Sequence, residues 1–382
     1  MKKSLLSLAM LAMCLTASSE QTDESPDPAE ARLSQILLDD EELEFFDQDV
    51  FDYVINLPYQ TTDLPTISAV AINPSATVSV QDGVITCTSS DETVQKNYSL
   101  TFNILPKLDL FLAIGQSNMS GRAPYDDARD PMENVWLLTP QGNMEISSNP
   151  MNKYSNVRTD LSYQGMGPSY SFSLMLRDLL HLNIGMIVNA RGGSSLNVWY
   201  EPGKECYDAT VQRIQQARKW GVFKGIIWHQ GSADWNPEDN YEIYKQHLAQ
   251  MVEHFRSEIE NDTLWFICGE VRQLEYLKNF NKDVIQTVKE YITYSDFVSS
   301  EGTTLMEDNT HFDEQSYILM GKRYAEKIIE HVYGDRTTIT TINPPACTDN
   351  RIFTLLGTYV GDDFSSLPSG LYIRNQKIII KQ

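Results

Sequence analysis

The sequence predicts an α/β fold, a three-layer α/β/α sandwich on a parallel sheet, preceded by a small all-β sandwich and followed by a short β tail. Apolar runs of strand length recur through residues 107–335, and patterns with helical spacing separate them. Near both ends of the chain, apolar residues instead recur at every second position, as in exposed strands. Strands that alternate with helices in this way are typical of a doubly wound sheet.

Length, composition and charge limit the number of domains and the kind of partner that can be expected. At 382 residues the chain exceeds one average domain, so two or more folded units are expected. Hydrophobic residues make up 41% of the chain and charged residues 21%, which is typical of globular domains. The formal net charge of −22 repels phosphate backbones and argues against nucleic acid as a partner.

Residues 1–19 have the pattern of a signal peptide. Lys2 and Lys3 precede an apolar run, and small residues follow it. This run is too short to span a bilayer, and no later segment is long enough, so we expect a secreted or periplasmic protein with no transmembrane segment. The alternative is a surface lipoprotein anchored through Cys14. Residues 20–32 are rich in Glu and Asp and contain Ser25 and two prolines, which predicts a flexible leader.

Residues 33–106 show the period of strands. Tyr53, Ile55 and Leu57 lie two apart, and turn residues such as Asp82-Gly83 separate this run from others like it. The pattern predicts a small antiparallel, Ig-like sandwich. The segment resembles the cadherin-like β-sandwich modules of exported bacterial proteins.

Residues 107–335 carry the predicted α/β unit. The run Leu108–Ile114 is nearly continuous in apolar residues, as a strand buried on both faces requires. Further predicted strands are Ile184–Val188, Gly225–Trp228, Leu264–Cys268 and Phe297–Ser299. Predicted helices are Ser169–Leu182, Tyr207–Trp220, Tyr241–Ile259 and Glu314–Tyr333.

Residues 336–382 return to strand-like segments, of which Arg351–Leu356 and Gly370–Ile373 are the clearest. They resemble the C-terminal strands of many secreted bacterial proteins, so we expect a packing or sorting role for this tail.

Cysteine usage predicts no disulfide framework. Four cysteines follow the predicted signal peptide and allow three full pairings, but they lie far apart in different predicted elements. Cys87 and Cys268 stand among apolar strand residues, so we expect buried thiols there. No CxxC pair or histidine-rich cluster predicts a metal site.

A candidate nucleophile follows the first buried strand of the α/β unit. Ser117 stands in Gly115-Gln116-Ser117-Asn118-Met119, just past Ile114. The binding crevice of an open α/β sheet lies outside the carboxyl ends of its strands, which is where this serine is expected. Serine also caps helices, and the motif alone does not separate the two roles. It differs from the Gly-x-Ser-x-Gly elbow because position 119 is Met.

A serine nucleophile needs a base and a group that orients the base. His311 lies in the polar loop Glu307–His311, just before the last long helical pattern. Asp308 is three residues upstream, close enough to hold one ring nitrogen, although Asp-x-x-His alone also occurs at helix caps. Four of the other five histidines fall in helical patterns: His181, His247, His254 and His331.

Two further loops follow predicted strands, Arg191-Gly192-Gly193-Ser194-Ser195 and His229-Gln230-Gly231. Glycine lets the backbone approach a ligand closely, so an N–H of Gly193 can face a developing oxyanion, and the Gln230 side chain offers another donor. The first loop also suits phosphate, but it lacks the lysine of a P-loop.

Together these segments resemble the SGNH hydrolases, which have a flavodoxin-like fold. Within them they resemble the sialate O-acetylesterase-like group that includes carbohydrate esterase family 6, whose members are acetylxylan esterase-like. The matching blocks are Gly115–Arg122, Gly165–Pro168, Arg191–Ser195, Trp228–Gly231 and Asp308–His311.

The resemblance implies a serine carboxylic-ester hydrolase that removes acetyl groups from a glycan, acetylxylan or O-acetylated sialic acid, without cofactor or metal. It implies Ser117 as nucleophile, His311 as base and Asp308 as its partner. The implied oxyanion hole consists of the backbone N–H groups of Ser117 and Gly193 and the Gln230 side chain. The chain departs from the family pattern at one place: it has Gly231-Ser232-Ala233-Asp234 where the family usually has Gly-Glu-Ser-Asp. This difference bears on substrate fit or on the geometry of the loop.

Trp199, Tyr200 and Trp235 lie near these residues in sequence, and we expect some of them to stack on a sugar, although core packing is the commoner role. Two alternatives stay open: a carbohydrate-binding surface protein that has lost activity on the same scaffold, and a lipase-like enzyme. The acidic balance disfavours an anionic substrate unless a local basic patch overrides it. The sequence predicts neither the particular glycan nor the oligomeric state.

Overall fold

The computed structural model describes residues 26–125, 130–158, 163–236, 240–334, 351–354, 358–374 and 377–381. The predicted signal peptide, with Cys14, lies outside these residues. The chain divides into two compact units, Met1–Val54 with Pro65–Thr101 and Ile55–Leu64 with Phe102–Gln382. The segment 55–64 therefore belongs to the larger unit, although it falls within the predicted span 33–106.

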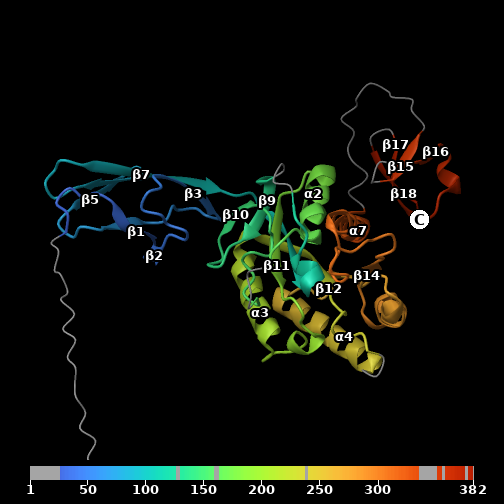
Figure 1. The fold of residues 1–382 in the computed structure, drawn as a ribbon. Coiled ribbons are helices and arrows are strands. Elements are labelled where there is room, and N and C mark those ends of the chain that lie inside the picture. The colour runs from blue at the N-terminus through green and yellow to red at the C-terminus, as the bar shows by residue number, and fades with distance from the viewer. Residues whose placement is uncertain are drawn as a thin grey trace, which may run out of the picture. The chain divides into compact units, whose positions relative to one another are not determined.

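Residues 33–104 form two sheets, with strand orders β2-β1-β4 and β3-β7-β6-β5 (Figure 1). The pairs β1–β4, β5–β6 and β6–β7 are antiparallel. Period-two alternation buries Ile85 and Cys87 on one face of β6. The Ig-like and cadherin-like assignments stay predictions. The strands are β1 Leu33–Leu38, β2 Glu41–Glu42, β3 Asp52–Leu57, β4 Ile67–Ala71, β5 Thr77–Gln81, β6 Val84–Thr88 and β7 Gln95–Ile104.

The larger unit is built on a seven-stranded, mainly parallel sheet of order β10-β9-β11-β8-β12-β13-β14. Its five strands β11-β8-β12-β13-β14 follow the flavodoxin-like order 2-1-3-4-5. The five predicted strands are all present, whereas the edge hairpin β9–β10 was not predicted. The strands are β8 Leu108–Gly115, β9 Met132–Leu138, β10 Met144–Ser147, β11 Ile184–Ala190, β12 Gly221–His229, β13 Trp265–Gly269 and β14 Ser295–Val298.

The four predicted long helices are present with ends shifted by a few residues. Two of them begin at side-chain caps: Asn240 accepts the backbone N–H of Glu242 at the start of α4, and Asp313 accepts that of Ser316 in α7. The helices are α1 Ser117–Ser120, α2 Pro168–Leu180, α3 Glu205–Ala217, α4 Tyr241–Ile259, α5 Lys278–Phe280, α6 Val288–Tyr291 and α7 Glu314–Val332.

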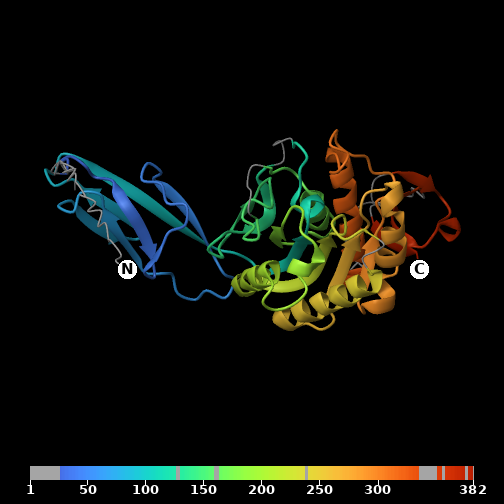
Figure 2. The ribbon, with the colours of Figure 1, turned by 60° about the horizontal axis from the view of Figure 1, so that its bottom comes forward.

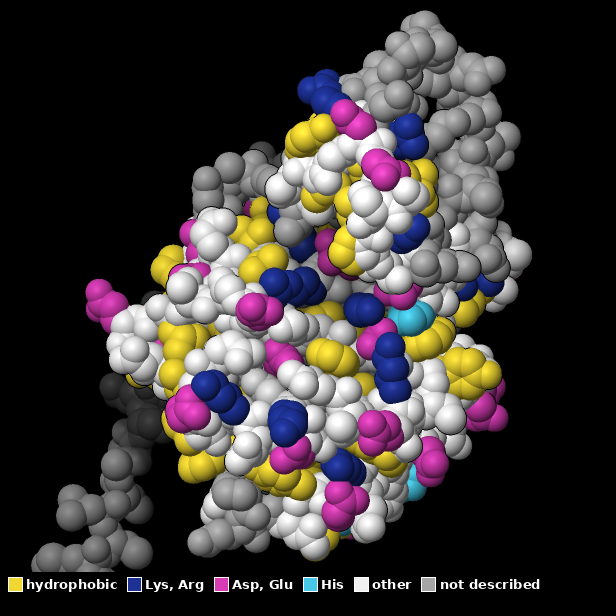
Figure 3. Space-filling view, turned by 90° about the vertical axis from the view of Figure 1, so that its right-hand side faces the viewer, with side chains coloured by type: hydrophobic (Ala, Val, Ile, Leu, Met, Phe, Trp, Pro, Cys, Tyr) yellow, Lys and Arg dark blue, Asp and Glu magenta, His cyan; other side chains and the backbone are white. Residues whose placement is uncertain are grey.

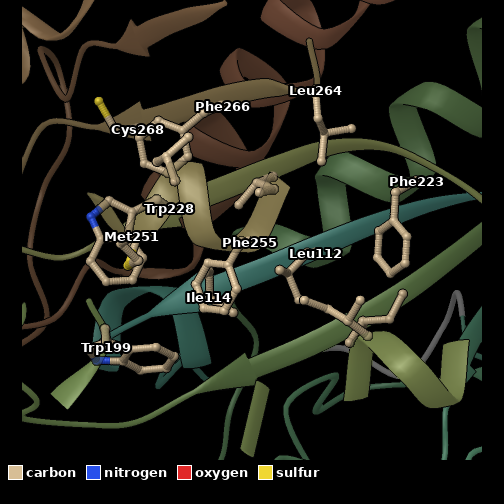
Figure 4. Close-up of a cluster of buried hydrophobic side chains, with 14 of the residues drawn as sticks. Leu112, Ile114, Trp199, Phe223, Trp228, Met251, Phe255, Leu264, Phe266 and Cys268 are labelled. Carbon is tan, nitrogen blue, oxygen red and sulfur yellow. The ribbon is translucent and has the colours of Figure 1, made fainter. Parts of the chain in front are cut away.

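Helices cover both faces of the sheet, with α2 and α7 on one face and α3 and α4 on the other (Figures 1 and 2). Side chains of β8 alternate between two buried clusters for this reason. Leu112 and Ile114 pack with residues of α3 and α4, while Phe111 and Ala113 pack with residues of α2 and α7. Figure 4 shows the first cluster. Burial on both faces explains the unbroken apolar run of this strand.

The C-terminal residues form an antiparallel sheet of order β16-β15-β17-β18. Its strands are β15 Ile352–Thr354, β16 Tyr359–Gly361, β17 Gly370–Arg374 and β18 Lys377–Lys381. The sorting role of this tail stays a prediction. Among the described residues, no helix combines the length and the hydropathy needed to cross a membrane.

The described cysteines are free and buried. Cys87 and Cys268 have no exposed surface, which confirms the predicted buried thiols, and Cys206 is buried as well. Cys347 lies outside the described residues.

Candidate active site

Three of the predicted site loops leave the sheet at the same level. Gly115, the last residue of β8, pairs with Ala190 of β11 on one side and with His229 of β12 on the other. Gly115 has φ +140°, and a Cβ at this position would lie 2.3 Å from the His229 carbonyl oxygen. Glycine is therefore required where the chain turns from β8 toward Ser117. The parallel pairing brings the residues after 115, 190 and 229 to one edge of the sheet.

Ser117 is the first residue of α1 and is 6% exposed. Its backbone N–H has no acceptor among the described residues, because the first N–H groups of a helix have no partner within the helix. The backbone N–H of Gly193 has no acceptor among these residues either. Gly193 has φ +72°, and a Cβ on Gly192 would lie 3.8 Å from the Cβ of Ser117. Because Ser117 and Gly193 line the same pocket, both backbone donors are available to an oxyanion that forms there.

His311 is held by Asp308 in the loop between β14 and α7. Its Nδ1 lies 2.6 Å from Asp308 Oδ2, and the backbone N–H groups of Thr310 and His311 both donate to Asp308 Oδ1. Burial opposes ionisation of Asp308, but the hydrogen bonds from His311 and Thr310 prevail and lower its pKa to about 2. The ionised carboxylate fixes the ring so that Nε2 is the free nitrogen.

Asn118, next to the nucleophile, connects the two loops. Its Oδ1 accepts the backbone N–H of Phe312 and the hydroxyl of Tyr317, and its Nδ2 donates to the Thr310 carbonyl. The side chain is 1% exposed. Asn118 therefore fixes the position of the His311 loop relative to Ser117.

These residues meet at a pocket of about 640 Å³, a volume in the range of small-molecule sites. Ser117 and His311 both line it, and no hydrogen bond between them occurs among the described residues. The lining residues are Gln116, Ser117, Arg122, Arg158, Tyr163, Arg191, Gly192, Gly193, Ser232, Ala233, Arg272, Met306, Asp308, Thr310 and His311.

His229 does not compete with His311 as a base. It is 1% exposed, does not line the pocket, and shares a hydrogen bond with the Tyr324 hydroxyl through Nδ1. Burial lowers its pKa to about 3, so the ring is neutral at physiological pH.

The structure does not place Gln230 where the sequence predicted it. Gln230 has no exposed surface and does not line the pocket. Its Nε2 donates to the Ser194 carbonyl and to the Asp234 carboxylate, while its Oε1 accepts the hydroxyl of Tyr244. Both amide hydrogens are thus committed within the fold, and none faces an oxyanion.

A different amide lines the pocket. The Oε1 of Gln116 accepts the backbone N–H of Gly231 at 3.1 Å, and its Nε2 has no acceptor among the described residues. Gln116 stands beside the nucleophile in the same sequence block, but its role depends on a contact with a loop more than a hundred residues away.

The predicted sugar-stacking aromatic residues do not line the pocket either. Trp199 has no exposed surface, packs edge-to-face against Trp228 and donates through Nε1 to Ser194 Oγ (Figure 4). Tyr200 stacks on His247. Core and helix packing thus decide the place of these rings.

Trp235 packs edge-to-face on Tyr276 and stays outside the pocket lining. The aromatic side chain that does line the pocket is Tyr163, which is 70% exposed. The sequence offered no signal for Tyr163, because no periodic pattern surrounds it.

Four arginines line the pocket: Arg122, Arg158, Arg191 and Arg272. Two of them stand in matched sequence blocks, whereas Arg158 and Arg272 stand in none. Among the described residues, the group with the spacing of metal ligands is Asp296, Glu330 and His331, outside this pocket. Its Asp296 carboxylate forms ion pairs with two lysines, Lys289 and Lys327.

The family match with known proteins falls within the larger unit. A family model described as carbohydrate esterase, sialic acid-specific acetylesterase, matches residues 107–330. A probable carbohydrate esterase of Arabidopsis thaliana is 22% identical over 250 residues, which are 59% of this chain and 92% of that protein. Its X-ray structure superposes with a TM-score of 0.53 at 21% identity, covering 59% of this chain and all of that chain, which shows a shared fold.

A crystal structure of a carbohydrate acetylesterase from Xanthomonas citri matches with a TM-score of 0.42 at 15% identity, over 83% of this chain and 82% of that chain. An exo-beta-1,6-galactobiohydrolase of Bifidobacterium longum is 35% identical over 98 residues, which are 22% of this chain and 6% of that protein.

Proposed function

The chain belongs to the carbohydrate esterase family of sialic acid-specific acetylesterases, and on that premise we propose that it removes acetyl groups from glycans through an acyl-enzyme on Ser117. One observation carries the proposal. Ser117 and His311 line the same pocket, and Asp308 holds the imidazole at 2.6 Å. A nucleophile, a base and an orienting carboxylate thus come from the loops after two different strands, which is the arrangement of a serine hydrolase.

In the first step Ser117 Oγ attacks the acetyl carbonyl while His311 Nε2 takes the hydroxyl proton. Asp308 stabilises the imidazolium that forms. The tetrahedral intermediate then collapses: the bond to the sugar oxygen breaks, and His311 returns the proton to that oxygen. In the second step His311 takes a proton from water, the water oxygen attacks the acetyl-Ser117 carbonyl, and acetate leaves as Ser117 regains its proton.

The oxyanion of each intermediate is negatively charged and needs donors. The backbone N–H groups of Ser117 and Gly193 supply two, because neither has an acceptor within the described residues. For the third donor we assign the Nε2 of Gln116 in place of that of Gln230. The N–H of Gly231 holds the Gln116 amide by its oxygen, which leaves its NH₂ group for the pocket.

The test is hydrolysis of p-nitrophenyl acetate and release of acetate from acetylated xylan and from O-acetylated sialic acid. Ser117→Ala should lower kcat/KM at least about 10³-fold without lowering the melting temperature, because the side chain supplies the nucleophile and holds no element together. Full activity in a folded Ser117→Ala variant would falsify the proposal.

The same experiment judges the alternative of a carbohydrate-binding protein without activity. That alternative predicts that the wild-type chain binds an acetylated glycan and releases no acetate. An octanoyl ester cleaved faster than the acetyl ester would instead favour a lipase-like enzyme.

A further inference from the structure

The end of β12 and the loop after it hold the chain segments that carry the three proposed oxyanion donors, although none of the donors belongs to this loop. The backbone N–H of Gln116 donates to the carbonyl of the last residue of β12 at 2.9 Å, which fixes the chain just before Ser117. The backbone N–H of Gly231 donates to Gln116 Oε1 at 3.1 Å, which directs the amide of that side chain. The third donor, the N–H of Gly193, is held less directly.

Gly193 stands in open space. A Cβ placed on it would meet no atom within 4 Å, and its backbone N–H has no acceptor among the described residues. Glycine is also the residue type with the most backbone freedom. The direction of this N–H is therefore decided by the contacts on either side of it. On the upstream side, the N–H of Arg191 donates to the Gly115 carbonyl at 2.9 Å and connects the loop to the sheet.

On the downstream side, two side chains of the loop after β12 hold the chain just past Gly193. Gln230 Nε2 donates to the Ser194 carbonyl at 3.0 Å. Asp234 Oδ2 accepts the backbone N–H of Leu196 at 3.0 Å and also accepts Gln230 Nε2. Asp234 thus binds the chain directly and also orients the amide that binds it a second time. Hydrogen bonds to an ionised carboxylate are stronger than those to a neutral oxygen, which suits this double role.

We propose that Asp234 is a positioning residue of the esterase: it holds the loop after β11 so that the N–H of Gly193 faces the oxyanion. The inference rests on the proposed function and adds a residue that none of its steps involves. Asp234 is absent from the pocket lining, whereas Gly193 is part of it. The carboxylate therefore acts through the backbone of the loop and touches no reacting atom.

Oriented donors next to the oxyanion matter because distant surface charges add little. Acidic and basic side chains are interspersed on the face that Figure 3 shows, so no field of a single sign arises from that face. Salt also screens exposed charges over about 10 Å. A fixed N–H needs no reorganisation when the oxyanion forms. A displacement of about 1 Å at such a group costs up to about 10²-fold in rate.

The test compares Asp234→Ala with Asp208→Ala. Asp208 makes the same kind of contact at the same distance, because its Oδ1 accepts the backbone N–H of Gly203 at 3.0 Å, and neither residue lines the pocket. Asp234→Ala should lower kcat on p-nitrophenyl acetate about 10- to 100-fold with little change in KM, because the oxyanion exists only after attack on the ester. Asp208→Ala should leave kcat unchanged. A loss below about threefold in Asp234→Ala, or an equal loss in both variants, would overturn the inference.

A trifluoromethyl ketone separates an effect on the oxyanion from a general loss of structure. With trifluoroacetone, Ser117 Oγ bonds to the carbonyl carbon, the hydroxyl proton passes to His311, and the carbonyl oxygen becomes the oxyanion. The inhibition constant should therefore rise in Asp234→Ala by about the factor by which kcat/KM falls. An inhibition constant equal to that of the wild-type chain would contradict the positioning role.

Asp234→Asn keeps an oxygen that accepts both N–H groups and loses only the charge. Its kcat should fall by about two- to fivefold, less than that of Asp234→Ala. Equal losses in the two variants would show that the contact with Leu196 has no effect and would reject the role. If Asp234→Ala does not fold, Asp234→Ser replaces it, because its hydroxyl is one bond shorter than the carboxylate and loses the contact. Unfolding of both would assign Asp234 to the fold alone and reject the role as well.

Failure of this inference and failure of the proposed function are distinguishable. If the wild-type chain cleaves neither p-nitrophenyl acetate nor the acetylated glycans, the acetylesterase proposal fails. Hydrogen exchange at the Leu196 amide, followed by NMR, then judges the loop contact without activity. Exchange at least about tenfold faster in Asp234→Ala than in the wild-type chain and in Asp208→Ala supports the contact, and equal exchange in all three rejects it.

Discussion

The two sides of the pocket are held in different ways. Ser117 follows the central strand β8, is 6% exposed, and owes its place to strand pairings on both sides of Gly115. The His311 side chain is 20% exposed and that of Asp308 is 42% exposed, and both lie in a loop fixed by a few hydrogen bonds. The sheet thus positions the nucleophile, whereas side-chain chemistry positions the base. Changes to the buried contacts around the nucleophile should therefore affect folding, and changes to the side chains that hold the base should affect activity far more than stability.

The sharpest test of this comparison is Asp308→Asn. The amide no longer stabilises the imidazolium and favours the wrong tautomer of His311, so kcat/KM on p-nitrophenyl acetate should fall about 10⁴-fold. The melting temperature should change little, because the residue is half exposed and its loop keeps its backbone contacts. A loss below tenfold, or unfolding of the variant, would contradict the division between the two sides.

On the nucleophile side, Gln116 and Gln230 make a pair of amides with different expected roles. Gln116→Ala removes a donor to the oxyanion and should lower kcat about 10²- to 10³-fold. Gln230→Ala removes the acceptor of the buried Tyr244 hydroxyl and one of the donors to Asp234, so it should lower the free energy of unfolding by about 1–3 kcal/mol. Kinetics and urea unfolding of both variants decide the assignment, and a larger kcat loss in a folded Gln230→Ala variant would restore Gln230 as the donor.

Asn118 joins the two sides, so its substitution should affect both properties. Asn118→Ala removes the buried acceptor of the Phe312 N–H and of the Tyr317 hydroxyl, which should cost about 1–3 kcal/mol of stability. The loosened His311 loop should also lower kcat by about tenfold, with a smaller change in KM. Asn118→Asp keeps both acceptor contacts and loses the N–H donated to Thr310, so it tests that third contact separately. Unchanged activity in Asn118→Ala would show that Asp308 alone fixes the base.

The smallest effect concerns the pH dependence of stability on the base side. The folded-state pKa of Asp308 is lowered from 3.8 to about 2, so its ionised form stabilises the fold above the unfolded-state value. This contribution should disappear as the pH falls through about 2. The difference in unfolding free energy between the wild-type chain and Asp308→Asn should therefore shrink between about pH 5 and about pH 2. A difference that stays constant over this range would contradict the lowered pKa.

The sequence predicted the parts of the fold and site that depend on local pattern. Continuous apolar runs mark strands buried on both faces, so β8, β11 and β12 were found, while β9 was missed. The Asp308–His311 contact spans three residues and was also predictable.

The rest depends on contacts between distant residues. Gln230 is buried because Ser194, Asp234 and Tyr244 use its amide, and Trp199 because it packs on Trp228. Arg272 carries no local signal at all. Its place in the pocket lining results from contacts across the fold, and no single sequence window contains that information.

The pairing of Gly115 with Ala190 and His229, at the carboxyl ends of three parallel strands, has a consequence for folding. These residues are far apart in the chain, so the crevice forms only after the parallel strands β8, β11 and β12 have paired. Long-range pairings of this kind close late and slowly. During refolding, ester hydrolysis should therefore return only after the sheet has assembled, and no activity should appear before that point. Enzymatic turnover would then report the last stage of folding.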